Sequence, residues 1–250
     1  MNFHFYSATS MNSRGFKPNE DVIVCDSKNK IAIVCDGVTQ KHDEYEADCN
    51  TSDAQIVSQI FATELHKSLL SGKEAEESTS IANNAVRLYN SCAKNAYPPA
   101  LVFVCAQIKN GILDFFYVGD SLIYLFRNNV RICLAEQQTF ALSFMRQWKT
   151  ISKDEVYKTI ANKPEHPLGY GVITGDPSAI CFLQHTHIEL LSGDRIVLAS
   201  DGLDKYLRFT PPKDIIAQSP SNILEVSRVY DNPPYAAYAD DKSIVIIDVD

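Results

Sequence analysis

Five short stretches of the sequence each place acidic residues at the edge of an apolar, strand-like segment. Two stretches precede such a segment, "NED" and "YADD", and three end one, "IAIVCDG", "FFYVGDS" and "RIVLASDG". The acids concerned are Glu20, Asp21, Asp36, Asp120, Asp201, Asp240 and Asp241. Mg²⁺ and Mn²⁺ prefer oxygen ligands, and clustered carboxylates repel one another unless a cation or a proton lies between them. If the fold brings these acids together, the pattern therefore predicts a divalent metal site.

Such a site would have a defined chemistry. Two cations about 4 Å apart that share a bridging carboxylate can clamp a phosphate group and lower the pKa of a water for in-line attack. The competing interpretation is that these acids are turn residues, because Asp-Gly, as in Asp36-Gly37, is a frequent hairpin dipeptide. For any one acid alone, a turn or a cap is the more frequent role. The shared context and the order of the five stretches favour the metal site.

Hydrophobic patterning predicts the elements that must position these acids. The runs "DVIVCD" and "KIAIVCD" predict a hairpin around "SKNK", and further strands are expected over 179–191, 195–200 and "SIVIIDV". Asn110-Gly111 and Asn128-Asn129 are hairpin signals that predict an antiparallel meander over 100–134. A helix is expected from an N-cap at Thr51 or Ser52 to a stop at Gly72, a second over about 74–95, and short helices near 140–147 and 152–161. These elements predict an α+β fold in one domain, residues 1–250, with antiparallel sheets inside and helices outside.

The composition excludes several classes of partner. The chain has 250 residues and a net charge of −8, without a long Lys/Arg run, which argues against nucleic acid or an anionic membrane as the partner. No segment approaches the roughly 20 apolar residues of a membrane span. The cysteines number seven, an odd count, and the chain has no CxxC pair and no signal-peptide pattern at its start. We therefore expect reduced thiols and a cytoplasmic protein, with a monomer favoured.

Taken in order, the motifs "NED", "VCDGV", "YVGDS", "LASDG" and "DDKSIVII" resemble the motif series of the metal-dependent type-2C protein phosphatases, the PPM family. The resemblance runs from about residue 14 to 249, essentially the whole chain. Each motif is weak alone, and the five in one order are specific. The resemblance implies a four-layer αββα sandwich of two antiparallel sheets flanked by helices. It also implies a phosphatase that acts on phosphoserine or phosphothreonine proteins by direct attack of a water bridging two Mn²⁺ or Mg²⁺ ions.

The resemblance also implies a role for each acid. Asp36 would bridge the two ions, and Asp21 would hold metal-bound water. The remaining predicted ligands are Glu20 and the backbone carbonyl of Gly37 for one ion, Asp201 and Asp240 for the other, and Asp120 for a weaker third ion. No side chain would act as a covalent nucleophile.

The sequence departs from the family pattern where the substrate phosphate would bind. The family places an Arg a few residues before "ED", but here Phe16 has that spacing, with Arg14 and Lys17 beside it. Arg14 is our predicted phosphate-binding residue and Lys17 is the alternative, although a Lys cannot bind phosphate in a bidentate manner. Two further departures are Thr39-Gln40 in place of Gly-Gly, and Leu122 in place of the Arg of "GDSR".

These departures spare the acids, so an active phosphatase is the favoured hypothesis. The alternative within the same fold is a catalytically weak pseudophosphatase or a phosphopeptide-binding module, which the missing Arg would suit. A third hypothesis abandons the resemblance and proposes an antiparallel sandwich with acidic loops that binds carbohydrate or calcium. The free cysteines and the absence of a secretion signal weigh against that third hypothesis.

Overall fold

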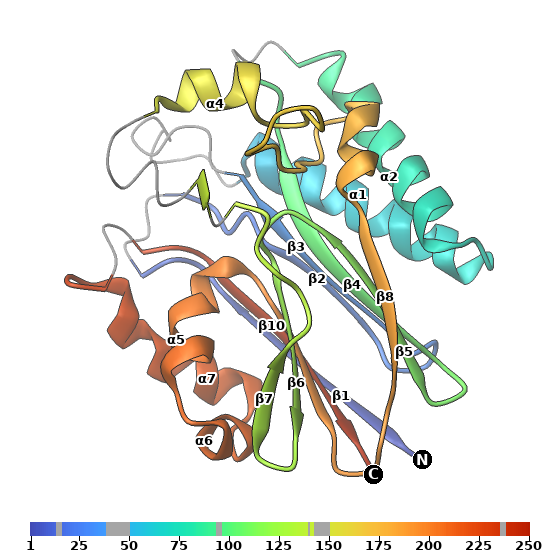
Figure 1. Cartoon of the computed structure of the whole chain (residues 1–250), viewed down its shortest axis with the longest axis vertical. Coiled ribbons are helices and arrows are strands. Elements are labelled where there is room, and N and C mark those ends of the chain that lie inside the picture. The colour runs from blue at the N-terminus through green and yellow to red at the C-terminus, as the bar shows by residue number, and fades with distance from the viewer. Residues whose placement is uncertain (14–16, 39–50, 94–96, 140, 143–150, 236–238) are drawn as a thin grey trace.

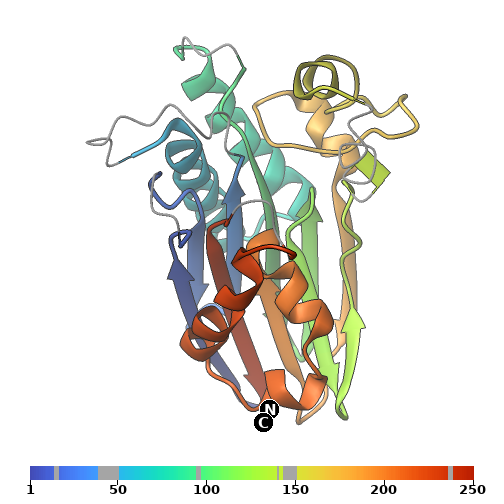
Figure 2. The ribbon, with the colours of Figure 1, turned by 90° about the vertical axis from the view of Figure 1, so that its left-hand side faces the viewer.

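Two five-stranded antiparallel sheets face each other, and helices cover both outer faces (Figures 1 and 2). The computed structural model describes residues 1–13, 17–38, 51–93, 97–139, 141–142, 151–235 and 239–250. Within that part of the chain, no helix combines the length and apolarity needed to cross a bilayer. The predicted α+β class and the αββα layering are confirmed. The single-domain boundaries and the cytoplasmic location stay predictions.

The two sheets are formed by strands from different parts of the chain. One sheet has the order β1 (Phe3–Ser10), β10 (Lys242–Val249), β9 (Arg195–Ala199), β6 (Leu122–Arg127) and β7 (Val130–Cys133). The other has the order β2 (Val22–Asp26), β3 (Ile31–Gly37), β4 (Leu101–Lys109), β5 (Ile112–Val118) and β8 (Gln184–Glu189). The first sheet therefore joins the two ends of the chain, because β1 pairs with β10 along its full length.

The helices divide between the two outer faces. The helices α1 (Asp53–Leu70) and α2 (Ala75–Asn90) pack on the sheet that contains β3 and β4. The helices α5 (Asp204–Phe209), α6 (Pro212–Ile216) and α7 (Pro220–Ser227) cover the sheet that contains β9 and β10. The structure also describes the helix α4 (Lys153–Thr159) and the 3₁₀ turns η1 (Pro177–Phe182), η2 (Asp201–Leu203) and η3 (Arg228–Asp231).

Strand β3 is apolar throughout because both of its faces are covered. Ile31, Ile33 and Cys35 pack toward α1 and α2, whereas Ala32 and Val34 pack between the two sheets. Side chains alternate along a strand, so Asp36 shares the face of Ala32 and Val34. The pattern therefore places the Asp36 carboxylate at the rim of the layer between the sheets.

The two Asn-containing hairpins form as predicted, but the single meander over 100–134 is wrong. Asn110 and Asn128 adopt positive φ, as a two-residue hairpin turn requires. However, β5 lies in one sheet and β6 in the other. Gly119 makes this crossing with a φ of +95°, and a Cβ there would lie 2.2 Å from the Val102 side chain. Only glycine can adopt this backbone conformation without a clash, and Asp120 follows Gly119 directly.

Other boundaries are confirmed or corrected by local contacts. Ser52 caps α1, since its Oγ accepts a hydrogen bond from the backbone N of Gln55. The second helix ends at Asn90 rather than near residue 95. The strand expected from residue 179 begins at Gln184, because Asp176 caps a 3₁₀ turn there by accepting from the backbone N of Ser178. Most of the helix expected near 140–147 lies outside the described residues.

Candidate metal centre

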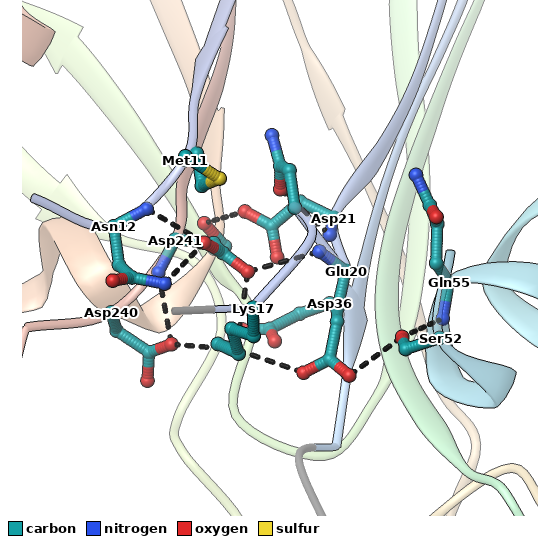
Figure 3. Close-up of polar contacts among 12 residues, drawn as sticks. Met11, Asn12, Lys17, Glu20, Asp21, Asp36, Ser52, Gln55, Asp240 and Asp241 are labelled. Atoms are coloured by element: carbon teal, nitrogen blue, oxygen red, sulfur yellow. Dashed lines mark hydrogen bonds and ion pairs between the residues drawn. The ribbon is translucent and has the colours of Figure 1, made fainter. Parts of the chain in front are cut away.

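Five of the predicted acids lie close together at the end of β3 and at the segments before β2 and β10, as Figure 3 shows: Glu20, Asp21, Asp36, Asp240 and Asp241. Asp241, directly before β10, connects these segments by hydrogen bonds. Its Oδ1 accepts a hydrogen bond from the backbone N of Asn12 at 2.8 Å, and its Oδ2 accepts one from the backbone N of Glu20 at 2.9 Å. Asp241 is buried, so it orients the segment that carries Glu20 and Asp21.

Asp36 and Asp201 form a carboxylate pair. The backbone N of Asp201 donates a hydrogen bond to Oδ2 of Asp36 at 3.3 Å. Burial raises the pKa of both carboxyls well above its usual range; the charge of Asp21 adds to the shift at Asp36, and the charge of Asp36 adds to the shift at Asp201. The charges of Asp120 and Asp240 raise both pKa values further. Four of the predicted ligands therefore act on one another electrostatically.

Asp21 is buried, whereas Asp36 and Asp201 are partly exposed. The Ser200 hydroxyl donates to its Oδ2 at 2.7 Å, and the same hydroxyl oxygen accepts from the backbone N of Ser243 at 2.9 Å. Burial raises the pKa of Asp21 well above its usual range, with the charge of Asp241 as the next cause. Asp21 thus links the start of β2 to the end of β9, in a position to orient polar groups at the site.

Glu20 is fully buried, and both of its carboxylate oxygens have partners in the chain. Its Oε1 accepts from the Ser52 hydroxyl at 2.7 Å, and its Oε2 lies 2.8 Å from Nζ of Lys17. The same Nζ lies 3.1 Å from Oδ2 of Asp241 and 3.7 Å from Oδ1 of Asp240 (Figure 3). Burial opposes the charge of Lys17, but these three carboxylates outweigh it and hold the Lys17 pKa above its usual value. The ammonium of Lys17 therefore supplies a positive charge to this group of carboxylates without a metal ion.

Asp120 approaches the site from the crossing between the sheets. Its Oδ2 accepts a hydrogen bond from the Thr139 hydroxyl at 2.7 Å. The turn before it is fixed by Gln138, whose Oε1 accepts from the backbone N of Gly119 at 3.1 Å. Asp120 thus has a defined orientation and lies near enough to raise the pKa of Asp36 and Asp201.

Solved structures with this architecture cover the whole chain. The Mycobacterium tuberculosis serine/threonine phosphatase PstP/Ppp has a TM-score of 0.68 at 18% identity, with 100% of each chain covered. The PPM Ser-Thr phosphatase MsPP from Mycobacterium smegmatis has a TM-score of 0.64 at 16% identity and covers 99% of this chain and 98% of its own. This chain has the PPM phosphatase fold. At these identities the likeness shows the fold alone.

Two further neighbours with the PPM fold hold divalent ions. The catalytic domain of PstP was solved with two manganese ions, at a TM-score of 0.67, 17% identity and 99% coverage of each chain. RsbX was solved with magnesium, at a TM-score of 0.59 and 14% identity, with 99% of this chain and 96% of its own covered. No protein-family profile and no curated protein matches this sequence.

Two predicted site residues of the PPM pattern need separate comment. Arg14 lies outside the described residues, so the phosphate-binding role of Arg14 stays a prediction. Phe16 and Thr39-Gln40 also lie outside the described residues. Gly37 packs directly on Glu20: a Cβ at Gly37 would lie 2.7 Å from the Glu20 carbonyl oxygen. Glycine is therefore required for the close approach of β3 to the segment that carries Glu20.

The donor chemistry of the site fits a hard divalent cation. All the predicted side-chain donors are carboxylates, and, in addition to burial, the charges of Asp36, Asp240 and Asp120 each raise the pKa of Asp201, so a cation among them would be stabilised. As the described residues stand, no group of three or more His, Cys, Asp or Glu side chains is arranged to hold an ion.

Sequence reasoning did not foresee the position of Lys17. The sequence suggests Lys17 only as a substitute for the phosphate-binding Arg, yet its side chain is just 9% exposed and contacts acids from both ends of the chain. The available signal was its spacing of three residues from Glu20. The contacts with Asp240 and Asp241 depend on the pairing of β1 with β10 and could not be found locally.

Replacing Ser52 with alanine is expected to lower the free energy of unfolding by about 0.5–2 kcal/mol, the usual cost of losing an N-cap. The variant also removes a hydrogen-bond donor from the buried Glu20 carboxylate. Urea denaturation measures the first effect and Mn²⁺ titration the second. Ser219→Ala is the matched control, since Ser219 caps α7 and is not among the residues of the site. Equal loss of Mn²⁺ affinity in both variants would contradict the link between Ser52 and the site.

The free energy of unfolding of the metal-free protein is expected to fall as the pH rises. Asp36 and Asp201 have raised pKa values in the folded state, so the folded protein binds more protons than the unfolded chain. The stabilisation is complete below the ordinary carboxyl pKa of about 4 and is lost as the pH rises through the raised values. Melting curves in chelator across this range test the prediction. Asp36→Asn should flatten the profile, and an unchanged slope in that variant would contradict it.

Proposed function

We propose that this chain is a Mn²⁺- or Mg²⁺-dependent phosphatase that hydrolyses phosphoserine and phosphothreonine esters in proteins. The observation that carries the proposal is the Asp36–Asp201 carboxylate pair, with the charges of Asp120 and Asp240 acting on it. Such a pair is stable as two anions only with a cation beside it. Its place at the strand ends of a PPM fold favours phosphate ester hydrolysis over other metal chemistry.

Each residue of the site would have a separate role in this reaction. A divalent ion, when bound, supplies Lewis-acid activation of the phosphate ester and of water. Asp36, Asp201 and Asp240 would hold it, and the side chain of Asp240, 41% exposed, leaves one side open to solvent. Asp21, fixed by the Ser200 hydroxyl, would orient the attacking water. Arg14 would bind the phosphate group of the substrate.

A second candidate function is phosphopeptide binding without turnover. The observation that favours it is Lys17, whose ammonium already neutralises part of the acidic cluster without any metal. In this case the fold would present a phosphate-binding surface, and the acids would serve structure alone. The two functions differ in whether phosphate is released.

Hydrolysis of a small aryl phosphate and of a phosphothreonine peptide by the full chain distinguishes the two functions. We expect turnover with Mn²⁺, loss of turnover in excess chelator, and recovery when Mn²⁺ is restored. Turnover that persists in chelator would overturn the metal-dependent mechanism. Peptide binding with no phosphate release in Mn²⁺ or Mg²⁺ would favour the second function.

A further inference from the structure

Lys17 has contacts that phosphate ester hydrolysis does not require. Its Nζ lies 2.8 Å from Oε2 of Glu20, 3.1 Å from Oδ2 of Asp241 and 3.7 Å from Oδ1 of Asp240. The side chain is 9% exposed, so the ammonium is largely removed from solvent. Three carboxylates from two distant parts of the sequence thus surround a single positive charge, much as oxygen ligands surround a metal ion.

The shortest of these contacts is with Glu20, and the longest, 3.7 Å, is with Asp240, which the resemblance assigns to the other ion. The resemblance assigns Glu20 and the carbonyl of Gly37 to one of the two ions, and Gly37 packs against Glu20. Both Glu20 carboxylate oxygens are already taken, one by the Ser52 hydroxyl and the other by Lys17. By contrast, among the described residues, the ion pairs of Lys17 do not include Asp36 or Asp201.

We propose that the ammonium of Lys17 takes the place of one of the two divalent ions, so that this chain binds one tight divalent ion at Asp36, Asp201 and Asp240. This inference rests on the proposed function, because it concerns the same site. It departs from the two-ion expectation that the resemblance carries. Lys17 is thereby a built-in counter-ion, and the Glu20 side of the site is filled before any metal binds.

Elementary electrostatics supports a single ion. A cation tethered to the chain neutralises carboxylate charge without being recruited from solution, and it repels a divalent ion placed beside it. A metal ion on the Glu20 side would have to displace an ammonium whose side chain is almost completely buried. Displacement would leave the buried ammonium of Lys17 without its carboxylate partner, and an unpaired buried charge is strongly unfavourable. At Asp36 and Asp201 the situation is reversed: these acids repel one another until a cation binds, so a divalent ion is stabilising there.

Counting tightly bound Mn²⁺ by equilibrium dialysis and electron paramagnetic resonance tests the inference without measuring activity. We expect one tight ion per chain in the wild type and two in Lys17→Met, which keeps the apolar stem and removes the charge. Lys17→Arg keeps the charge and should retain one ion. Lys28→Met is the matched control on the exposed β2–β3 turn and should also retain one.

The outcomes separate this inference from the proposed function. Two tight ions in the wild type, or one ion in both the wild type and Lys17→Met, would overturn the role of Lys17 and leave the phosphatase proposal standing. No tight ion in any of the four proteins would overturn the metal-dependent function, and the inference with it. If Lys17→Met does not fold, the wild-type count decides alone: one ion supports the inference and two ions overturn it.

Discussion

Asp36→Asn is expected to lower kcat/KM for an aryl phosphate by at least about 10²–10³-fold, the usual effect of removing one preorganised electrostatic group from an active site. Asp36 ends β3 and contacts Asp201, so the substitution removes one charge from the centre of the carboxylate pair. The asparagine has nearly the same shape, and the loss therefore reports on charge rather than packing. Initial rates in saturating Mn²⁺ provide the measurement.

The matched control is Asp114→Asn. Asp114 lies on β5 and pairs with His185 on the neighbouring strand β8, and it is not among the acids of the metal centre. Its replacement should leave kcat/KM within about twofold, as expected for a surface change away from special features. Equal activity of Asp36→Asn and the wild type would show that the pair takes no part in hydrolysis.

Mn²⁺ is expected to raise the free energy of unfolding by about 2.7 kcal/mol at 100 times its dissociation constant. For a domain of this size, roughly 2–4 °C per kcal/mol converts this to a rise in Tm of about 5–11 °C. The physical reason is that a cation relieves the repulsion between Asp36, Asp201 and Asp240 only in the folded state. Differential scanning fluorimetry across a Mn²⁺ titration measures the shift.

Asp201→Asn should abolish most of this stabilisation. The same substitution should raise the Tm of the metal-free protein, because it removes a repulsive charge; stabilising substitutions are commonly worth about 0.5–2 kcal/mol. Asp114→Asn should show the full Mn²⁺ shift. A Mn²⁺ shift in Asp201→Asn as large as in the wild type would place the bound ion elsewhere on the chain.

Much of the fold followed from local patterns. Strand β3 was predictable because a strand covered on both faces is apolar throughout, and its end at Asp36 marked the rim of the sandwich. The Asn110-Gly111 turn was predictable because few residue pairs adopt positive φ. The convergence of acids was an inference from motif order, and the contact of Asp36 with Asp201 agrees with it.

The errors came from contacts that are distant in sequence. Strand β1 was missed because "FHFYSATS" is an edge strand with mixed polarity, and its partner β10 lies at the other end of the chain. The crossing at Gly119 was missed because a continuous run of hairpins looks the same whether or not it changes sheet. The role of Lys17 was missed for the same reason, since two of its three carboxylate partners follow it by more than 200 residues.

The most direct test is an anomalous difference map from crystals soaked in Mn²⁺. We expect a peak enclosed by the carboxylates of Asp36, Asp201 and Asp240, at the roughly 2.0–2.6 Å that hard cations keep from oxygen ligands. A map with no peak there, or with its only peaks at surface acids such as Asp114, would contradict the account.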